Sequence, residues 1–331
     1  MLALPQFWLE QGWPARILRP LAACFSGAVQ VRAFAYRRGW LRSYRVGVSV
    51  VVVGNLFVGG SGKTPLVIWL VERLRAGGWR PGVVSRGYGG YSSGKPRLVK
   101  ADDDPVHQGD EPVLIAARTG APVAVGADRV AAAECLVRDG RCDLVISDDG
   151  LQHYRLERDA EIVVFDADRG AGNARCFPAG PLREPLSRLR RVDLVVGNGG
   201  VVDSAGYAFR LVPGRLIALG CDSPSVAPPM IGSRIRAVAG IGYPERFFRL
   251  LRTLGYRVVP QPFPDHHVFR LKDLQYAEPL PIIMTEKDAV KCRRMAVDGL
   301  WYLPVAAEPD VRTQNALDSL LSRLLPRTVD N

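Results

Sequence analysis

The chain has 331 residues, of which 47% are apolar and 23% charged, so it is long enough for one large or two medium globular domains with hydrophobic cores. This composition excludes a largely disordered chain. The formal net charge of +11 predicts an acidic partner, and nucleic acid, an anionic membrane surface and a phosphorylated substrate all satisfy that condition.

Residues 1–45 predict a helical region that associates with a membrane surface. The apolar run 21–29 is too short to span a bilayer, which takes roughly 20 residues. Aromatic residues and arginines flank this run, a pattern typical of an amphipathic helix lying at a membrane interface. A helix packed against the protein has the same pattern, so that alternative stays open.

Residues 46–198 predict an α/β domain with a mostly parallel sheet and helices on both faces. Short β-branched runs alternate with helical patterns along this segment. Such alternation is typical of sheets in which a helix connects successive parallel strands. The expected strands are 46–53, 82–85, 122–126, 143–147, 161–167 and 192–198, and the expected helices are 65–77, 111–120 and 128–140.

The rest of the chain predicts a smaller second α/β unit. Residues 199–233 are rich in Gly, Pro and Ser and indicate a linker with irregular strands. Residues 234–331 return to alternating strand and helix patterns. The expected strands are 235–241, 256–261, 281–285 and 300–305, and the expected helices are 244–255, 286–295 and a final one near 310–325.

The stretch VVVGNLFVGGSGKTP, residues 51–65, indicates a variant phosphate-binding loop of the P-loop NTPase type. A strand precedes a glycine-rich turn, and a helix follows it. The residues expected to bind the nucleotide phosphates are Gly59, Gly60, Ser61, Gly62, Lys63 and Thr64, with Lys63 facing the phosphate charge and Thr64 facing Mg²⁺. Phe57 stands where such loops carry their first glycine.

A second acidic element is expected at the end of a neighbouring strand. DLVISDDG is an apolar run that ends in Asp148 and Asp149, in the position of a Walker B motif. The two aspartates predict ligands for Mg²⁺ or for its water shell, although strand-end aspartates also begin turns.

These motifs form an ordered series with SRGYGG (85–90), GDEP (109–112), DDGLQH (148–153), PAGPLREP (178–185), FPDHH (263–267) and TEKDAVK (285–291). The series resembles the tetraacyldisaccharide 4'-kinase family, the lipid A 4'-kinases. The resemblance implies transfer of the ATP γ-phosphate to the 4'-hydroxyl of a tetraacylated glucosamine disaccharide 1-phosphate, which forms lipid IV-A. It also implies an enzyme on the cytoplasmic face of the inner membrane.

The resemblance also implies roles for single residues. Asp110 and His266 match the residues of a catalytic dyad, and Glu184 matches a further acidic residue near the metal. It further implies that Arg86, His153 and Lys287 contact the substrate or its phosphates.

Each of three of these residues also has an alternative without a catalytic or binding role. Asp110 is also suited to cap the helix that begins at Glu111. His266 is also consistent with a loop histidine that has no role. Lys287 is also consistent with a surface ion pair with Asp288.

Two other classes of protein are weighed against a kinase. The loop resembles that of membrane-associated P-loop switch proteins. Such proteins carry a signature lysine before the glycine pair, where this chain has Val58. TEKD differs from the NKxD pattern that reads guanine, which favours ATP over GTP. A nucleic-acid-binding ATPase needs basic and aromatic elements for base stacking, and the sequence has no such pattern, so no nucleic acid is expected as partner.

Overall fold

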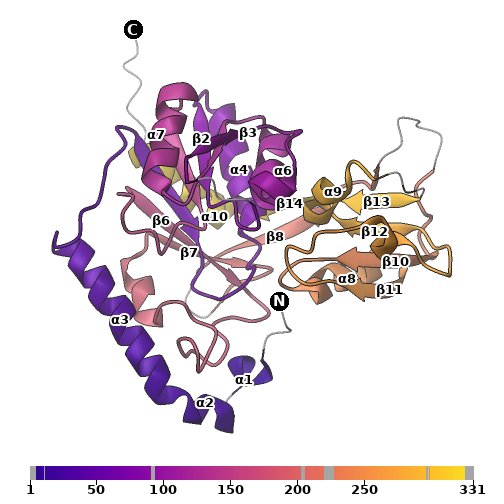
Figure 1. Cartoon of the computed structure of the whole chain (residues 1–331), viewed down its shortest axis with the longest axis horizontal. Helices are drawn as coiled ribbons and strands as arrows, with labels where there is room; N and C mark the ends of the chain where they lie inside the picture. The colour runs from indigo at the N-terminus through magenta and orange to yellow at the C-terminus, as the bar shows by residue number, and fades with distance from the viewer. Residues whose placement is uncertain are drawn as a thin grey trace.

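The computed structural model describes residues 5–10, 12–90, 94–202, 206–219, 227–295, 297 and 299–324. Its strands form two sheets, which belong to a large unit and a small unit lying side by side (Figure 1). The helices are α1 (Gln6–Leu9), α2 (Trp13–Ile17), α3 (Arg19–Arg37), α4 (Lys63–Ala76), α5 (Pro105–Gln108), α6 (Asp110–Thr119), α7 (Arg129–Asp139), α8 (Pro244–Thr253), α9 (Glu286–Cys292) and α10 (Val311–Leu324), with short 3₁₀ helices at η1 (Leu186–Arg191) and η2 (Leu271–Leu274).

The large unit is built on a nine-stranded sheet. In spatial order its strands are β14 (Val305–Pro309), β8 (Tyr207–Pro213), β7 (Leu194–Asn198), β6 (Ala160–Asp166), β1 (Ser49–Gly54), β5 (Leu144–Asp148), β2 (Pro81–Ser85), β4 (Val123–Val125) and β3 (Arg97–Val99). The seven strands from β8 to β4 are parallel, and β14 and β3 close the two edges antiparallel. The predicted α/β fold with a mostly parallel sheet is confirmed.

Helices cover both faces of this sheet because its central strands are apolar on both sides. Along β1, Val51 and Val53 pack into a core with α4, α6 and α10, whereas Val50 and Val52 pack on the opposite face with α7. This two-sided burial follows from the alternation of side chains along a strand. It leaves the carboxyl ends of the parallel strands as the edge from which loops reach a ligand.

The small unit contains a five-stranded sheet. Its spatial order is β11 (Arg257–Pro262), β10 (Arg234–Ala239), β12 (Ile282–Thr285), β13 (Leu300–Leu303) and β9 (Ile217–Ala218). β9 is antiparallel to β13, and the other pairs are parallel. Helix α8 packs its apolar side, including Phe248 and Leu251, against this sheet.

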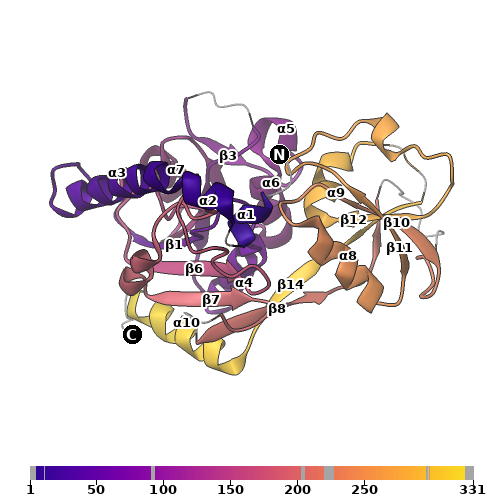
Figure 2. The same ribbon diagram turned by 90° about the horizontal axis from the view of Figure 1, so that it is seen from below.

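The boundary between the units differs from the division drawn from the sequence. Residues 207–213, expected in a linker, form β8 and extend the large sheet, and the C-terminal β14 and α10 return to the large unit. The chain therefore enters the small unit after β8 and leaves it into β14, so that this antiparallel pair connects the two units (Figure 2). A strand pattern does not say which sheet the strand joins, which is why the sequence assigned these segments elsewhere.

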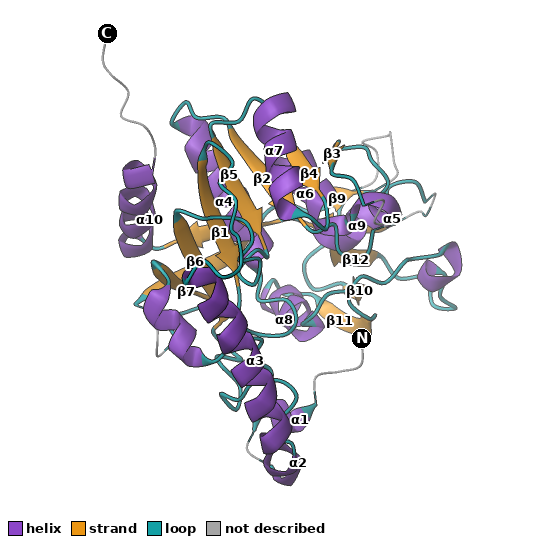
Figure 3. Ribbon diagram, turned by 60° about the vertical axis from the view of Figure 1, so that its left-hand side comes forward, coloured by secondary structure: helices purple, strands orange, loops and turns teal. Residues whose placement is uncertain are grey.

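The N-terminal helices lie outside both sheets, with α3 along the flank of the large unit (Figure 3). Tyr36 of α3 stacks on Tyr154 at 5.8 Å between ring centroids, and Trp8 Nε1 donates to the carbonyl oxygen of Pro178 at 2.9 Å. Large apolar side chains are nevertheless exposed along these helices and just after them, namely Trp13, Ile17, Leu21 and Val31 on the helices and Trp40 beyond α3. In the part of the chain that the structure describes, no helix is both long and apolar enough to cross a membrane.

Candidate active site

The phosphate-binding loop connects β1 to α4. Gly59 and Gly62 have φ angles of 106° and 73°, a left-handed conformation that side chains rarely adopt. A Cβ atom on Gly62 would lie 2.1 Å from Nδ2 of Asn198, so this position has no room for a side chain. The same Nδ2 donates to the carbonyl oxygen of Ser61 at 3.1 Å. The end of β7 therefore holds the backbone of residues 59–64, which are expected to bind ATP.

Phe57, the residue in place of a loop glycine, packs beneath the loop. Its side chain is 3% exposed, and its backbone forms a bridge with Leu182. The guanidinium carbon of Arg169 lies 4.8 Å from the centre of the Phe57 ring, and Arg169 donates to the carbonyl oxygen of Gly60. The phenyl ring thus supports an arginine that fixes the loop.

Lys63 and Asp149 form the charged centre of the loop. Lys63 Nζ lies 3.2 Å from Asp149 Oδ1, and Arg183 Nη1 lies 3.1 Å from Asp149 Oδ2. Burial by itself would raise the pKa of Asp149, but Lys63 and Arg183 outweigh it and hold that pKa well below its usual range. Asp149 therefore remains ionised beside the phosphate loop.

Asp148, the last residue of β5, is fully buried, and both of its carboxylate oxygens lack a hydrogen-bond partner. Burial, followed by the nearby Glu111, raises its pKa to about 7. A buried carboxylate without partners is costly unless a cation compensates it. This orphaned carboxylate, next to Asp149 in the chain and close to Lys63, therefore fits a hard cation such as Mg²⁺.

Glu184 is bound by protein donors. Its oxygens accept from Gln152 Nε2 at 3.0 Å and from the Tyr154 hydroxyl at 2.5 Å, and Arg188 Nε lies 3.5 Å away. Gln152 Nε2 also lies 3.3 Å from the carbonyl oxygen of Asn55, just before the loop. Among the described residues, no group of three or more His, Cys, Asp and Glu side chains is arranged to hold a metal ion. Mg²⁺ commonly binds one or two carboxylates together with phosphate oxygens and waters, so a site of this kind needs no such group.

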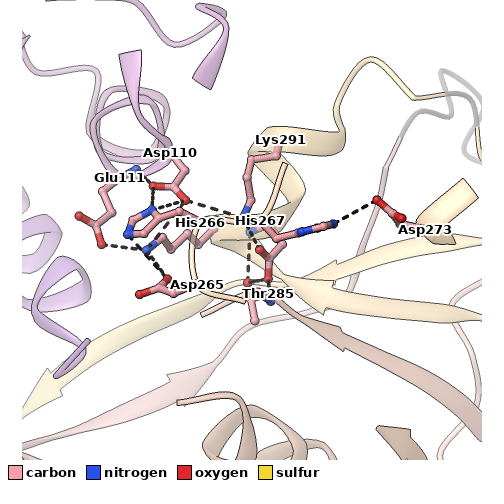
Figure 4. Close-up of polar contacts among 11 residues, drawn as sticks. Asp110, Glu111, Asp265, His266, His267, Asp273, Thr285 and Lys291 are labelled. Carbon is pink, nitrogen blue, oxygen red and sulfur yellow. Dashed lines mark hydrogen bonds and ion pairs between the residues drawn. The ribbon is translucent and has the colours of Figure 1, made fainter. Parts of the chain in front are cut away.

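Asp110 and His266, hereafter the dyad, meet across the boundary of the two units (Figure 4). His266 Nδ1 lies 3.0 Å from Asp110 Oδ1 and 3.1 Å from Oδ2, although 156 positions separate the residues. Asp110 is the first residue of α6, and the N-cap is Gly109, so Asp110 does not cap the helix. His266 follows β11 in a left-handed conformation with φ of 60°. The dyad thus requires both units.

Two lysines of α9 bring positive charge to the dyad. Lys287 Nζ lies 3.0 Å from Glu111 Oε1, 3.3 Å from Asp265 Oδ1 and 3.9 Å from Asp110 Oδ2. Lys291 Nζ lies 3.7 Å from Asp110 Oδ2. Lys287 therefore points into the site. These contacts differ from the surface ion pair with Asp288 that was the alternative from the sequence.

The charges around the dyad separate the pKa values of its members. Burial would raise the pKa of Asp110, but Lys287 and His266 outweigh it, and this pKa lies well below its usual range. Burial would lower the pKa of His266, but the hydrogen bond with Asp110 outweighs it, and this pKa lies above its usual value. The dyad is therefore stabilised as a carboxylate beside an imidazolium.

The TEKDAVK segment supports the site from within the small unit. Thr285 caps α9 by accepting from the backbone N–H of Asp288 at 3.1 Å. Asp288 is fully buried and accepts from the N–H of Gly240 at 2.8 Å, while Lys291 Nζ lies 2.6 Å from its other oxygen. The segment thus connects the lysines at the dyad to the loop that begins at Gly240.

Two cavities adjoin these residues. One, hereafter the loop cavity, has a volume of about 190 Å³ and is lined by residues 60–65 of the large unit and by Gly242, Arg246 and Lys287 of the small unit. The other has a volume of about 600 Å³ and is lined in part by the dyad. Asp110 is thus on the wall of one cavity, and its neighbour Glu111 is on the wall of the other.

His153 lies in a strongly basic environment. Burial, followed by Arg129 and Arg86, lowers its pKa to about 4, so the imidazole is neutral at pH 7. Arg32 of α3 and Arg158 contribute in the same direction. The two predicted contact residues Arg86 and His153 therefore share a region of positive potential that includes the N-terminal helix.

Several residues of the site escaped the sequence analysis. Arg183 and Lys291 stand inside the segments PLREP and TEKDAVK, so their positions in these motifs were a signal that could have found them. Asn198 ends an expected strand, and such an end at the edge of a parallel sheet was a usable signal. Arg169 lies in a loop whose pattern gave no signal.

A phosphate-binding loop at the carboxyl edge of a mostly parallel sheet, together with a carboxylate–imidazole contact between the two units, is the arrangement of a P-loop kinase. The family model described as tetraacyldisaccharide-1-P 4'-kinase matches residues 14–325. The chain therefore belongs to the tetraacyldisaccharide 4'-kinase family.

Individual relatives agree with this membership. The chain is 55% identical over 326 residues to a tetraacyldisaccharide 4'-kinase of Alkalilimnicola ehrlichii, with 98% of each chain covered. It is 52% identical over 328 residues to one of Halorhodospira halophila, covering 98% of this chain and 99% of that one. Among solved structures it is similar to LpxK from Aquifex aeolicus in complex with ATP, with a TM-score of 0.77, 27% identity, and coverage of 94% of this chain and 99% of the other.

Proposed function

We propose that the chain transfers the γ-phosphoryl group of ATP to the 4'-hydroxyl of a tetraacylated glucosamine disaccharide 1-phosphate, forming lipid IV-A. Membership of the family supports the reaction. The observation that carries the proposal is the 3.0 Å contact between Asp110 and His266. Asp110 belongs to the large unit, which also contains the phosphate loop, and His266 belongs to the small unit. A pair of this kind serves a hydroxyl acceptor and has no use in a simple nucleotide switch.

Residues 59–64 hold the phosphates of ATP, and Lys63 neutralises their charge. Thr64, Asp148 and Asp149 would hold Mg²⁺. Glu184, which the resemblance places near the metal, would support this region through Gln152, to which it is hydrogen-bonded at 3.0 Å. When bound, Mg²⁺ neutralises charge that develops on the phosphate oxygens. The orphaned oxygens of Asp148 support this assignment.

The dyad activates the acceptor. Asp110 accepts the proton of the 4'-hydroxyl, while His266 orients the carboxylate. A lowered pKa makes Asp110 a weak base, which suffices because phosphoryl transfer passes through a loose transition state with little demand for a strong nucleophile. Lys287 and Lys291 keep the carboxylate ionised and in place. Closure of the small unit over the large one excludes water from the γ-phosphate.

The acidic groups of the lipid meet the basic surface of the protein. Arg86, His153 and Lys287 contact the substrate or its phosphates, and the positive potential around His153 supports this role. The exposed apolar side chains of α2 and α3, with Ile17 at 66% and Leu21 at 60%, support binding of the N-terminal region to a membrane surface. We assign this surface to the cytoplasmic face of the inner membrane, where the enzyme is peripheral or monotopic.

The direct test is incubation of the full chain with Mg²⁺, ATP labelled in its γ-phosphate and the acylated disaccharide 1-phosphate in detergent micelles. We expect the label to enter the lipid. The matched control is the same lipid with its 4'-position already phosphorylated, which should remain unlabelled. Steady ATP hydrolysis without label in the lipid would contradict the proposal and favour a P-loop switch protein.

A further inference from the structure

The small unit touches the phosphate loop directly at two glycines. A Cβ atom on Gly242 would lie 2.8 Å from the backbone nitrogen of Gly60, so the two backbones approach more closely than a side chain allows. Gly242 lies in the loop held by Asp288 through Gly240, and α8 begins two residues later. The first turn of α8 is therefore placed over the loop that holds the phosphates.

Arg246 projects from this first turn into the loop cavity. Its Nη2 lies 2.7 Å from Asp166 Oδ1 and donates to the carbonyl oxygen of Asn198 at 3.4 Å. Its Nη1 lies 3.7 Å from the position that a Cβ of Gly62 would occupy. One edge of the guanidinium group is thus held by the ends of β6 and β7, while the other edge lies over the phosphate loop. Lys63 and Thr64 line the same cavity.

Asp166 is suited to hold the arginine in this position. Its side chain is 4% exposed, and it also forms an ion pair with Arg169 at 3.2 Å. Arg169 in turn donates to the carbonyl oxygen of Gly60. A buried carboxylate that binds two guanidinium groups restricts both. The cation from the small unit and the loop of the large unit therefore share one anchor.

We propose that Arg246 is a catalytic residue that the small unit holds against the triphosphate of ATP. This inference rests on the proposed function. A planar guanidinium presents paired donors that match phosphate oxygens, and its charge is retained at any physiological pH. Arg246 thus completes a cationic clamp, with Lys63 on the large unit and Arg246 on the small unit.

In the transfer step, the acceptor oxygen forms a bond to the γ-phosphorus, and the bond from that phosphorus to the bridging oxygen breaks. The electron pair of the broken bond leaves on ADP, and the acceptor proton passes to Asp110. Arg246 gives up no proton. It stabilises the negative charge that accumulates on the transferring group and on the leaving oxygen, which is largest in the transition state.

The test compares Arg246→Ala and Arg246→Lys with Arg249→Ala. Arg249 stands on the same helix and pairs with Asp168, but it does not line the loop cavity. Because an arginine of this kind is worth about 10³–10⁵ in turnover, we expect Arg246→Ala to lower kcat at least about 100-fold. Arg246→Lys should recover little of the loss, since an ammonium lacks the planar fork. Arg249→Ala should stay within about twofold of the wild type, as an exposed ion pair contributes little.

Binding of ADP with and without aluminium fluoride, a mimic of the transferring phosphoryl group, separates this inference from the identity of the acceptor. We expect Arg246→Ala to bind ADP alone within about threefold of the wild type and to lose most of the gain from aluminium fluoride, because the interaction belongs to the transition state. Retention of that gain, or an equal loss in Arg249→Ala, overturns the proposal. These measurements need no lipid, so failure to phosphorylate the disaccharide would count against the proposed function alone.

Discussion

The phosphate loop and the dyad are assembled in opposite ways. The loop takes its residues from one continuous stretch, 59–64, between a strand and a helix. The dyad joins the first residue of α6 to a loop of the small unit, 156 positions away in the chain. Local backbone geometry therefore builds the half of the site that contains the phosphate loop, whereas the relative placement of the two units builds the half that contains the dyad.

Because of this difference, the loop and the dyad should respond differently to a shift of one unit relative to the other. The loop is held by neighbours in its own sheet, such as Asn198 at the end of β7. The dyad depends on contacts between units, including the pair of Arg118 and Glu286 at 2.7 Å. A change that only shifts the units should leave the loop intact and impair catalysis, because small displacements of reacting groups are costly.

The largest expected effects come from removing one charge in each half. Lys63→Ala should weaken ATP binding and lower kcat/KM by about 10³, because it removes the charge that faces the phosphates. Asp110→Asn should lower kcat by about 10²–10⁴ with ATP affinity nearly unchanged, since it removes the proton acceptor. Steady-state kinetics combined with ATP binding would separate the two patterns.

Controls for this comparison lie on the surface. Lys272→Ala and Asp139→Asn change the same charges away from the site, so they should leave turnover near the wild-type value. Near-normal turnover of Asp110→Asn would contradict the assignment of the proton acceptor, and an equal loss of ATP affinity in both variants would remove the distinction between the halves.

The same contrast explains how much the sequence could reveal. The strand, the glycine turn and Lys63 follow one another, so local pattern predicted the loop and its neighbouring strands to within a few residues. The contact of Asp110 with His266 is tertiary, and no spacing along the chain encodes it, so only the family resemblance brought the two residues together. The site residue Arg246 likewise shows no pattern of its own, since an arginine near a helix start is common on protein surfaces.

Phe57 and β8 illustrate two further limits. The sequence showed that Phe57 departs from the usual loop, but only the three-dimensional packing shows that its ring supports Arg169. The strand pattern of 207–213 lay in a segment rich in turn residues, and pairing with β7 and β14 decided its structure. Tertiary partners overrode local composition in both cases.

A smaller effect is expected from separating the units without removing a charged group. In Gly242→Ala, the added methyl group meets the backbone of Gly60 at 2.8 Å and must push the small unit away from the loop. We expect kcat to fall about 10–100-fold, because misplacement by about 1 Å costs a factor of that order. Kinetics together with the melting temperature would show whether the loss exceeds any loss of stability.

The matched control for this variant is Gly27→Ala, where an added Cβ atom would meet nothing within 4 Å. Its turnover should equal that of the wild type. Full activity of Gly242→Ala would show that the contact of the two glycines does not set the geometry of the site.

The smallest expected effect is a pH dependence of stability that belongs to the dyad. The pKa of His266 is raised in the folded chain, chiefly because the hydrogen bond to Asp110 outweighs burial, with Asp265 adding to the rise and Lys287 opposing it. The stabilisation is therefore fully present below the unfolded pKa of about 6.5 and is lost as pH rises through the folded pKa. The lowered pKa of Asp110 acts in the other direction, because its contribution is present above about pH 4 and is lost at lower pH.

The free energy of unfolding should thus differ most between wild type and His266→Gln at about pH 5–6, by about 1 kcal/mol, the usual size of one hydrogen bond in a protein. Urea unfolding at pH 5.5, 7.0 and 8.5 would measure this difference, and we expect it to shrink as pH rises. In the Asp110→Asn background the difference should no longer shrink as pH rises, since the hydrogen bond that raises the pKa of His266 is gone while burial and Lys287, which lower that pKa, remain. A difference that grows with pH when Asp110 is present, or that still shrinks with rising pH without Asp110, would show that the imidazole is not held as a cation by the carboxylate, and the dyad would then be a contact of shape and not of charge.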